Sequence, residues 1–243
     1  MADIGAAAEG KLDLGRVARD TLAITGRRPV FVIGLSFLLA GVPNLLGGIF
    51  ASHVHSPVSF FFSGWGLLHT LVVIFLATFL TASLYRLSLG ELQGETPAPS
   101  EVFTTGAQLF LPLFAVNIMY FVAVGLGLIL LIVPGVMLAL AWCMAGPALF
   151  AEQTGITQSF GRSAQLTRGN RWRLFGLFLL FGIASAIAQS LFSAVGLAVS
   201  YAAEGLFSGP RLVGSAILAT ISTALATPGL AAVYVQLREP RGG

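Results

Sequence analysis

Six long runs of apolar residues constrain this chain more than any other feature of its sequence. A helix rises about 1.5 Å per residue, so about 20 apolar residues are needed to cross a hydrocarbon core of about 30 Å. The runs that are long enough give predicted spans at 29–50, 66–87, 109–133, 134–151, 174–201 and 212–235. The sequence therefore predicts an all-α, polytopic membrane protein with a single integral membrane domain over residues 1–243.

The composition agrees with this prediction. Apolar residues make up 56% of the chain and charged residues only 9%. About a quarter of the residues of a soluble domain are charged, so an ordinary soluble fold is excluded. The first apolar run follows a polar segment that contains Asp13 and Asp20. It also exceeds the apolar region of a signal peptide, which is about 7 to 15 residues long, and we expect a retained span.

The run 109–151 contains no charged residue to mark a boundary, yet it must contain two spans. A single helix of that length would measure roughly 65 Å, about twice the thickness of the hydrocarbon core. Pro134 disfavours helical geometry at Val133, and a proline followed by Gly135 is typical of a turn that opens a new helix. We therefore expect the six spans to form three helical hairpins.

Each predicted hairpin follows a short polar segment with helical periodicity. These segments lie near 12–24, 100–108 and 156–168. In the first, Leu14, Val17 and Ala18 recur at helical spacing, whereas Asp13 and Arg16 point elsewhere. We expect interfacial amphipathic helices that lie in the plane of the membrane surface. They would sense lipid, dock a partner, or only fix the depth of the bundle through snorkelling side chains.

The basic residues predict the orientation of the chain. With an even number of spans, twelve basic residues fall on one side of the membrane and only Arg211 falls on the other. The positive-inside rule places the basic side, with both termini, in the cytoplasm. Twelve of the thirteen basic residues are arginine, a bias typical of GC-rich bacterial genes, so we expect a bacterial inner (plasma) membrane.

The arginine clusters indicate a partner. Anionic headgroups of the inner leaflet attract such clusters by about 1 kcal/mol per basic residue. Membrane lipids are therefore the expected partners, with a membrane protein or a second copy of the chain as further possibilities. The residues expected to contact headgroups or a partner are Arg27, Arg28, Arg162, Arg168, Arg171 and Arg173.

No charged residue lies deep in any predicted span. Ion-coupled transporters usually carry an intramembrane charge that the mechanism moves, so a proton-driven pump is disfavoured. The polar residues of the spans are neutral, and they are Asn117, Tyr120, Gln189 and His69. Such residues either hydrogen-bond between helices, contributing about 0.6 kcal/mol, or contact a substrate.

The sequence offers no complete set of catalytic or metal-binding residues. His53 and His55 have a spacing that suits metal ligands, but only the distant Glu204 lies on the same predicted side. The other carboxylates are on the opposite side, so a Ser/His/Asp triad cannot form. Cys143 is the single cysteine, which excludes a disulfide. We therefore expect no catalytic site, no metal, no cofactor and no nucleic-acid partner.

Small residues and prolines predict local helix geometry. Small side chains let membrane helices approach closely, and prolines bend them. The predicted close-packing stripes are Ser215, Ala219, Ser222 and Ala226 in the last span, and Gly182 with Ala186 and Ala184 with Ala188 in the fifth. The predicted kinks are at Pro43, Pro112, Pro147 and Pro228.

Residues 132–180 carry a pattern that resembles a known family. Its features are Pro134 and Gly135, a helix with Pro147 that ends at Glu152, a segment over 159–167, Gly169, and Trp172 followed by another span. The pattern resembles the membrane-domain family found fused to some glycerophosphoryl diester phosphodiesterases, and related stand-alone bacterial membrane proteins. The resemblance implies a polytopic inner-membrane domain. The hydrolase domain of that family is absent from this sequence, so phosphodiesterase activity is not expected.

Three functions are compatible with these features. The basic edge and the lack of catalytic sets favour a non-enzymatic protein that organises lipids or partner proteins at the cytoplasmic leaflet. Repeated hairpins, prolines, Asn117 and Gln189 favour instead a transporter or channel for a small or amphipathic solute. An intramembrane enzyme acting on lipid is the least favoured, because no nucleophile and base share one face.

Overall fold

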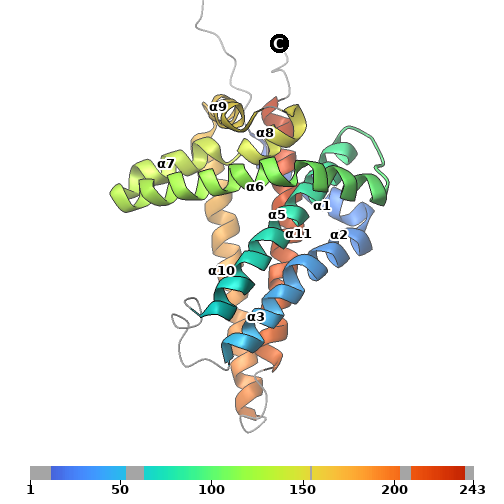
Figure 1. Ribbon diagram of the computed structural model, residues 1–243, viewed down its shortest axis with the longest axis vertical. Coiled ribbons are helices and arrows are strands. Elements are labelled where there is room, and N and C mark those ends of the chain that lie inside the picture. Colours follow the sequence, from blue (N-terminus) through green and yellow to red (C-terminus); the bar gives the residue numbers. More distant parts are fainter. Residues whose placement is uncertain (1–11, 53–62, 154, 203–208, 239–243) are drawn as a thin grey trace, which may run out of the picture.

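The computed structural model describes residues 12–52, 63–153, 155–202 and 209–238, and nearly all of them are helical (Figure 1). The elements are α1 (Leu14–Arg27), α2 (Pro29–Ser36), the π-helix η1 (Phe37–Gly41), α3 (Val42–Ser52), α5 (Gly64–Leu92), α6 (Pro99–Leu130), α7 (Ile132–Trp142), α8 (Ala145–Glu152), α9 (Ile156–Leu166), α10 (Arg171–Ala202) and α11 (Gly209–Arg238). No strand occurs within these residues.

Six helical segments are long and apolar enough to cross a membrane. They are Pro29–Phe50, Gly64–Leu92, Pro99–Leu130, Ile132–Glu152, Arg171–Gly196 and Leu212–Arg238. The prediction of an all-helical chain with six apolar spans is confirmed, and the protein is a multi-pass membrane protein.

The first span is one helical segment with a widened turn in its middle. α2 leads through η1 into α3, and the Val42 N–H donates to the carbonyl of Phe37, five residues earlier. Pro43 follows directly. Because proline has no N–H and its ring crowds the carbonyl four residues earlier, the regular helical ladder cannot continue, and the π turn accommodates it. The kink predicted at Pro43 thus coincides with a π turn.

A single extended residue, Leu131, joins α6 to α7, with φ −158° and ψ 131°. The close reversal depends on two glycines. A Cβ on Gly135 would lie 2.5 Å from the Leu128 nitrogen, and a Cβ on Gly127 would lie 3.0 Å from the Gly135 Cα. The boundary predicted at Pro134 lies at Leu131 instead, because proline fits the first turn of a helix, where its missing N–H is not needed.

The fourth span is broken, whereas the sequence predicted one continuous helix over 134–151. A two-residue turn separates α7 from α8, and Pro147 removes an N–H that would continue the ladder across it. Ser163 of α9 satisfies the freed backbone groups. Its hydroxyl accepts from the Met144 N–H at 3.0 Å and donates to the Ala141 carbonyl at 2.8 Å. The kink predicted at Pro147 is therefore a complete break, which α9 bridges.

Two of the three predicted amphipathic segments form separate helices. α1 begins after Asp13, whose carboxylate accepts from the N–H groups of Gly15 and Arg16. α1 packs against α11, and α9 packs against α8. The segment 100–108 is instead the first part of α6. Pro99 starts that helix in a position that proline favours, and no break follows it.

The helix α11 is central in the bundle, where it contacts α1, α2, η1, α3, α5, α8, α9 and α10. α10 and α11 run along the long axis of the molecule, whereas α6 and α7 lie side by side across it (Figure 1). The α6–α7 pair thus points away from the direction of the other long helices. The arrangement as three hairpins through one bilayer stays a prediction.

The basic residues gather at one end of the molecule. α1, α8, α9, the start of α10 and the end of α11 lie together at the upper end of Figure 1. With the last turns of α5, the residue between α1 and α2, and the turn between α9 and α10, these segments contain Arg16, Arg19, Arg27, Arg28, Arg86, Arg162, Arg168, Arg171, Arg173 and Arg238. We call this the basic end. Arg211 lies near the start of α11, at the opposite end.

Candidate functional site

A buried carboxylate joins the two arginines at the junction of α1 and α2. The Glu91 side chain, near the end of α5, is only 3% exposed. Arg28 Nε lies 3.7 Å from Glu91 Oε1, and Arg27 Nη1 lies 4.0 Å from Glu91 Oε2. Arg28 Nη1 also donates to the Pro97 carbonyl at 2.8 Å. A buried charge is costly without a partner, and here two guanidinium groups share one carboxylate, which leaves an excess of positive charge.

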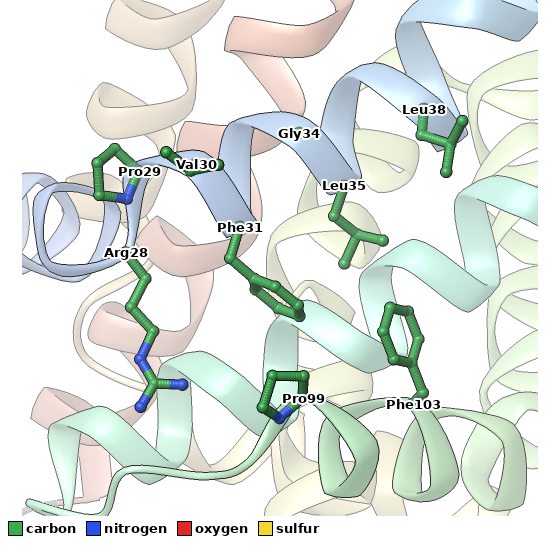
Figure 2. Close-up of a pocket in the computed structure, with 9 residues that line it drawn as sticks. All are labelled: Arg28, Pro29, Val30, Phe31, Gly34, Leu35, Leu38, Pro99 and Phe103. Atoms are coloured by element: carbon green, nitrogen blue, oxygen red, sulfur yellow. The ribbon is translucent and has the colours of Figure 1, made fainter.

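An apolar pocket of about 590 Å³ lies beside this pair, between α2 and the start of α6 (Figure 2). Its walls include Phe31, Leu35, Leu38 and Phe103, and Arg28 lines one end. We call it the interfacial pocket. Apolar walls suit an acyl chain, and a guanidinium group suits a phosphate, with which it forms strong paired hydrogen bonds. The pocket therefore combines apolar walls with a guanidinium group at one end.

Four further arginines predicted to contact headgroups lie within residues 162–173, and two of them bind within the protein. Arg162 Nε donates to both carboxylate oxygens of Glu152, at 2.9 and 3.1 Å. The Tyr234 hydroxyl donates to the same carboxylate at 2.8 Å. Arg173 Nη1 donates to the Leu12 carbonyl at 2.9 Å. These bonds connect α9, α8 and α11, and connect α10 to the segment before α1, so Arg162 and Arg173 hold the basic end together.

The other two arginines of that group have fewer internal contacts. Arg168 is exposed, and its side chain has no hydrogen-bond or ion-pair partner among the described residues. Arg171 begins α10, and its Nε is buried with no hydrogen-bond partner in the described part of the chain. Trp172, which is 83% exposed, follows directly. Tryptophan beside arginine is typical of a membrane–water interface. Of these four arginines, Arg168 is thus the exposed one whose side chain makes no contact of this kind within the described residues.

A second cavity, of about 720 Å³, lies between α5, α6 and the break from α7 to α8. We call it the groove. Asn117 and Tyr120, two of the predicted intramembrane polar residues, both line it, together with Tyr85 of α5. The Tyr120 hydroxyl donates to the Ala139 carbonyl at 3.4 Å. The Asn117 side chain makes no hydrogen bond within the described residues.

The other two predicted polar residues lie elsewhere. Gln189 is exposed on α10 and is not among the residues that line the groove. His69 Nε2 lies 3.0 Å from the Pro43 carbonyl, and the imidazole occupies the space beside Gly47. His69 therefore ties α5 to α3. The structure brings together only Asn117 and Tyr120 of the four.

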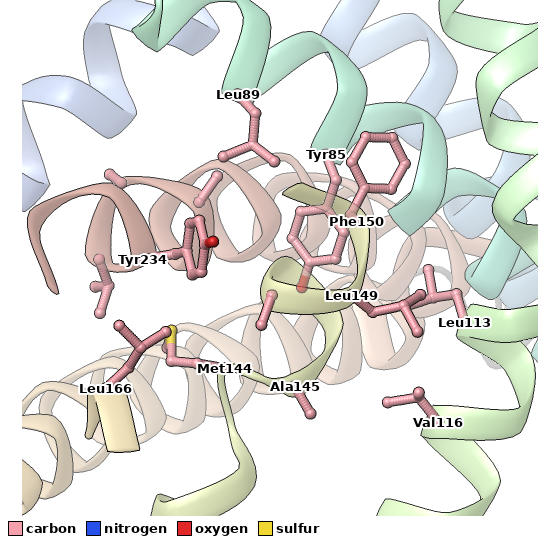
Figure 3. Packing of buried hydrophobic residues seen from close by; sticks show 14 of the residues in the cluster. Tyr85, Leu89, Leu113, Val116, Met144, Ala145, Leu149, Phe150, Leu166 and Tyr234 are labelled. Carbon is pink, nitrogen blue, oxygen red and sulfur yellow. The ribbon is translucent and has the colours of Figure 1, made fainter. Parts of the chain in front are cut away.

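Several residues that position these sites were not predicted from the sequence. Glu91 and Glu152 pair with arginines, and Ser163 bridges the break in the fourth span. Figure 3 shows Tyr85 and Tyr234 within the cluster of buried side chains near that break. A carboxylate near a span end, on the side that carries the arginines, is a signal that could have indicated an ion pair. It could not have indicated which arginine is the partner.

The described residues contain no group of three or more His, Cys, Asp or Glu side chains that could hold a metal ion. His53 and His55, considered above as ligands, lie outside the described residues. Cys143 is a free cysteine whose Sγ lies 3.1 Å from the Leu140 carbonyl. Both cavities have mainly apolar walls. The interfacial pocket has a guanidinium group, and the groove has amide, thiol and hydroxyl groups.

Comparison with known proteins gives one match. A family model described as a domain of unknown function (DUF7847) matches residues 12–237. No curated protein and no solved structure matches the chain. The match does not connect the chain with the membrane domains of glycerophosphoryl diester phosphodiesterases, so that resemblance stays a prediction. Because the matched region runs from the segment before α1 almost to the end of α11, the chain belongs to the DUF7847 family.

Proposed function

We propose that this protein is a non-enzymatic, multi-pass protein of the bacterial inner membrane that binds and organises anionic phospholipids at the cytoplasmic leaflet. The observation that carries the proposal is the interfacial pocket, in which apolar walls end at Arg28. The acyl chain would pack on Phe31 and Phe103, and the phosphate would meet the guanidinium groups of Arg27 and Arg28. The other outcome of the test is that the basic end binds a partner protein.

The charge of the basic end supports an anionic ligand. Its described segments carry ten arginines against three carboxylates, those of Asp20, Glu91 and Glu152. Each basic residue near an anionic surface contributes about 1 kcal/mol of attraction. The positive-inside rule then places the basic end and both termini in the cytoplasm. In this orientation α1 and α9 lie at the headgroup level, with Arg168, Arg171 and Trp172 beside them.

The test removes the charge and the pocket separately. The protein is reconstituted in nanodiscs with equal phosphatidylglycerol and phosphatidylcholine, and retained lipid is measured by native mass spectrometry. Arg27→Gln combined with Arg28→Gln removes both guanidinium groups. Gly34→Phe fills the pocket but keeps them, and a Cβ on Gly34 meets nothing within 4 Å. We expect each variant to lose retained phosphatidylglycerol about two- to fivefold.

The matched control is Gly182→Phe on α10, where an added Cβ also meets nothing within 4 Å. It should retain phosphatidylglycerol like the wild type. Unchanged retention in both test variants would contradict the proposal. If both variants keep the lipid but lose a co-purifying protein, the basic end binds a protein instead of lipid.

A transporter or channel for a small or amphipathic solute is the second candidate. The observation that favours it is the break between α7 and α8 beside the groove, because transporters often place broken helices at their solute sites. Cys143, the only cysteine, lines the groove. A water-filled path would let a membrane-impermeant maleimide label Cys143 in sealed vesicles. A dry groove, with no labelling, would remove the main support for transport.

A further inference from the structure

The groove is separate from the interfacial pocket and shares no lining residue with it. Its floor is buried, since Tyr85 and Val116 are only 3% and 2% exposed. Its rim is open, since Phe121 and Val122 are 71% and 56% exposed. These rim residues belong to the apolar part of α6. The groove therefore opens sideways from the bundle, and a ligand would enter it from the hydrocarbon of the bilayer.

The lining of the groove carries no formal charge. None of the residues that line it is Asp, Glu, Lys, Arg or His. A charged group brought into such a site would lose its hydration and gain no counter-charge, which is strongly unfavourable. The groove thus selects against a phosphate or ammonium headgroup. This distinguishes it from the interfacial pocket, which has Arg28 at one end.

Several hydroxyl groups of the groove are already bonded within the protein. Thr78 donates to the Ile74 carbonyl at 2.9 Å, and Thr81 donates to the Ala77 carbonyl at 2.8 Å. Tyr120 donates to a carbonyl of α7. These donors are satisfied within the bundle, so a ligand gains little from them.

Among the polar groups of the lining, the side-chain amide of Asn117 and the hydroxyl of Tyr85 have no hydrogen-bond partner in the described part of the chain. The Tyr85 hydroxyl lies beside Gly146, at 3.4 Å from the position of an added Cβ there. Both groups can donate and accept hydrogen bonds. In an apolar site an unpaired polar group is costly, so a ligand that supplies a hydroxyl or carbonyl group is favoured.

We propose that the groove binds a neutral lipid of the diacylglycerol class, with an uncharged hydroxyl or ester carbonyl that hydrogen-bonds to Asn117 and Tyr85. The hydrocarbon chains leave the groove past Phe121 and Val122 and remain in the bilayer. The volume of about 720 Å³ lies within the range of about 300–1,000 Å³ that is usual for small-molecule sites. It accommodates the glycerol group and the first part of the chains. This site goes beyond the anionic-lipid function proposed above.

The experiment uses the full chain in phosphatidylcholine nanodiscs that contain a diacylglycerol with a photoreactive diazirine in one acyl chain. Labelled peptides are identified by mass spectrometry. In the wild type we expect the label in α5, α6 and the α7–α8 break. Asn117→Leu removes the amide at similar volume and should reduce the labelling about five- to tenfold. Tyr85→Phe should act in the same direction.

The matched control is Gln189→Leu, which also replaces a side-chain amide by leucine but on the exposed face of α10, and it should label like the wild type. Val122→Trp is a second variant that narrows the rim at a position that is 56% exposed, and it should also reduce labelling. Gel filtration establishes that each variant is folded. Wild-type labelling in both Asn117→Leu and Val122→Trp would overturn the proposal. Cross-links between two copies of the chain at the groove would overturn it as well.

The two lipid proposals fail separately. Arg27→Gln with Arg28→Gln should leave diacylglycerol labelling unchanged, and Asn117→Leu should leave the retention of phosphatidylglycerol unchanged. Loss of diacylglycerol labelling on addition of equal phosphatidylglycerol would show that the groove accepts a charged lipid, which would also overturn the neutral-lipid proposal.

Discussion

α10 and α11 are neighbouring helices of 32 and 30 residues, yet they occupy opposite places in the fold. Half of the most apolar stretch of α11 is buried, against 6% of the corresponding stretch of α10. α10 turns Leu180, Ile187 and Leu191 outward, with at least half of each side chain exposed. The more apolar of the two helices is thus the one at the periphery.

Side-chain size explains this difference. One buried stripe of α11 consists of small residues, which are Ala216, Thr220, Ala224, Thr227 and Ala231. Such small side chains let η1 and α5 approach closely, whereas the leucine and phenylalanine side chains of α10 are equally well accommodated by lipid. In a bilayer the hydrocarbon is as apolar as leucine, so close packing and polar contacts decide which helix becomes central.

The largest effect is expected where α11 meets the first span. A Cβ on Gly41 would lie 2.5 Å from Thr220 Oγ1 and 3.3 Å from the Ala216 carbonyl. Gly41→Leu should therefore lower the stability by about 3 kcal/mol through overpacking. Gly182→Leu on α10 should leave it unchanged, because an added Cβ there meets nothing within 4 Å. Thermal unfolding in detergent measures both. Equal melting temperatures would mean that α11 is not closely packed.

A smaller effect is expected for the serine that bridges the break in the fourth span. Ser163 is buried and hydrogen-bonds both Met144 and Ala141. Ser163→Ala removes both bonds and leaves the buried Met144 N–H without its partner, whereas the Ala141 carbonyl keeps the Thr167 hydroxyl at 3.3 Å, and the change should cost about 2 kcal/mol. Ser190→Ala on α10 removes only an exposed bond to the carbonyl of Ala186, and should change the stability by less than about 0.5 kcal/mol. The same thermal assay compares the two variants. Equal losses of stability would contradict the expectation that the buried hydrogen bonds of Ser163 contribute more than the exposed bond of Ser190.

The smallest effect is expected from shortening a leucine. Leu218 of α11 is 7% exposed, whereas Leu180 of α10 is 64% exposed. Leu218→Ala should lower the free energy of unfolding by about 1 kcal/mol, because it leaves a cavity in the folded protein. The cost is small for a buried leucine because the side chain contacts apolar lipid or detergent when the helices separate, so burying it gains little. Leu180→Ala should be neutral in the same measurement. A larger loss for Leu180→Ala would show that α10 packs against a further protein surface in the membrane.

Much of the fold could be predicted from the sequence, because each span has its own signal. The predicted span 66–87 lies within α5, and the predicted span 29–50 coincides with the first membrane segment. At Pro147 the sequence predicted only a kink, whereas the helix is broken there into α7 and α8. Its completeness depends on Ser163, which satisfies the freed backbone groups from a different helix. That support is not visible in the sequence around Pro147.

The close-packing stripes show where periodicity is insufficient. Ser215, Ala219, Ser222 and Ala226 are only half-buried, and the buried stripe that includes Ala216 and Thr220 begins one residue later. On α10, the predicted stripe residues Gly182, Ala184 and Ala186 are exposed. α11 carries small residues in more than one register. Their spacing therefore predicts that a close contact is possible but does not specify which face a neighbour covers.

The candidate sites were predicted only in part. Residue type alone pointed to Arg28 and Asn117, which do line cavities. Arg162 and Arg168 have the same residue type and were predicted to act alike, although the first binds Glu152 and the second is exposed. Gln189 has the same chemistry as Asn117 but faces outward. Exposure and pairing separate these residues, and both arise from the packing of the helices.

The sequence by itself determined that this is a multi-pass helical membrane protein and gathered its arginines on one predicted side. The physical reason is that bilayer thickness and the cost of burying charge act on each segment separately. Only the tertiary structure decided that Glu91 holds Arg27 and Arg28, and that Asn117 and Tyr85 share one groove. Those contacts join segments far apart in the chain, so they follow from how the helices pack and not from the properties of any one segment.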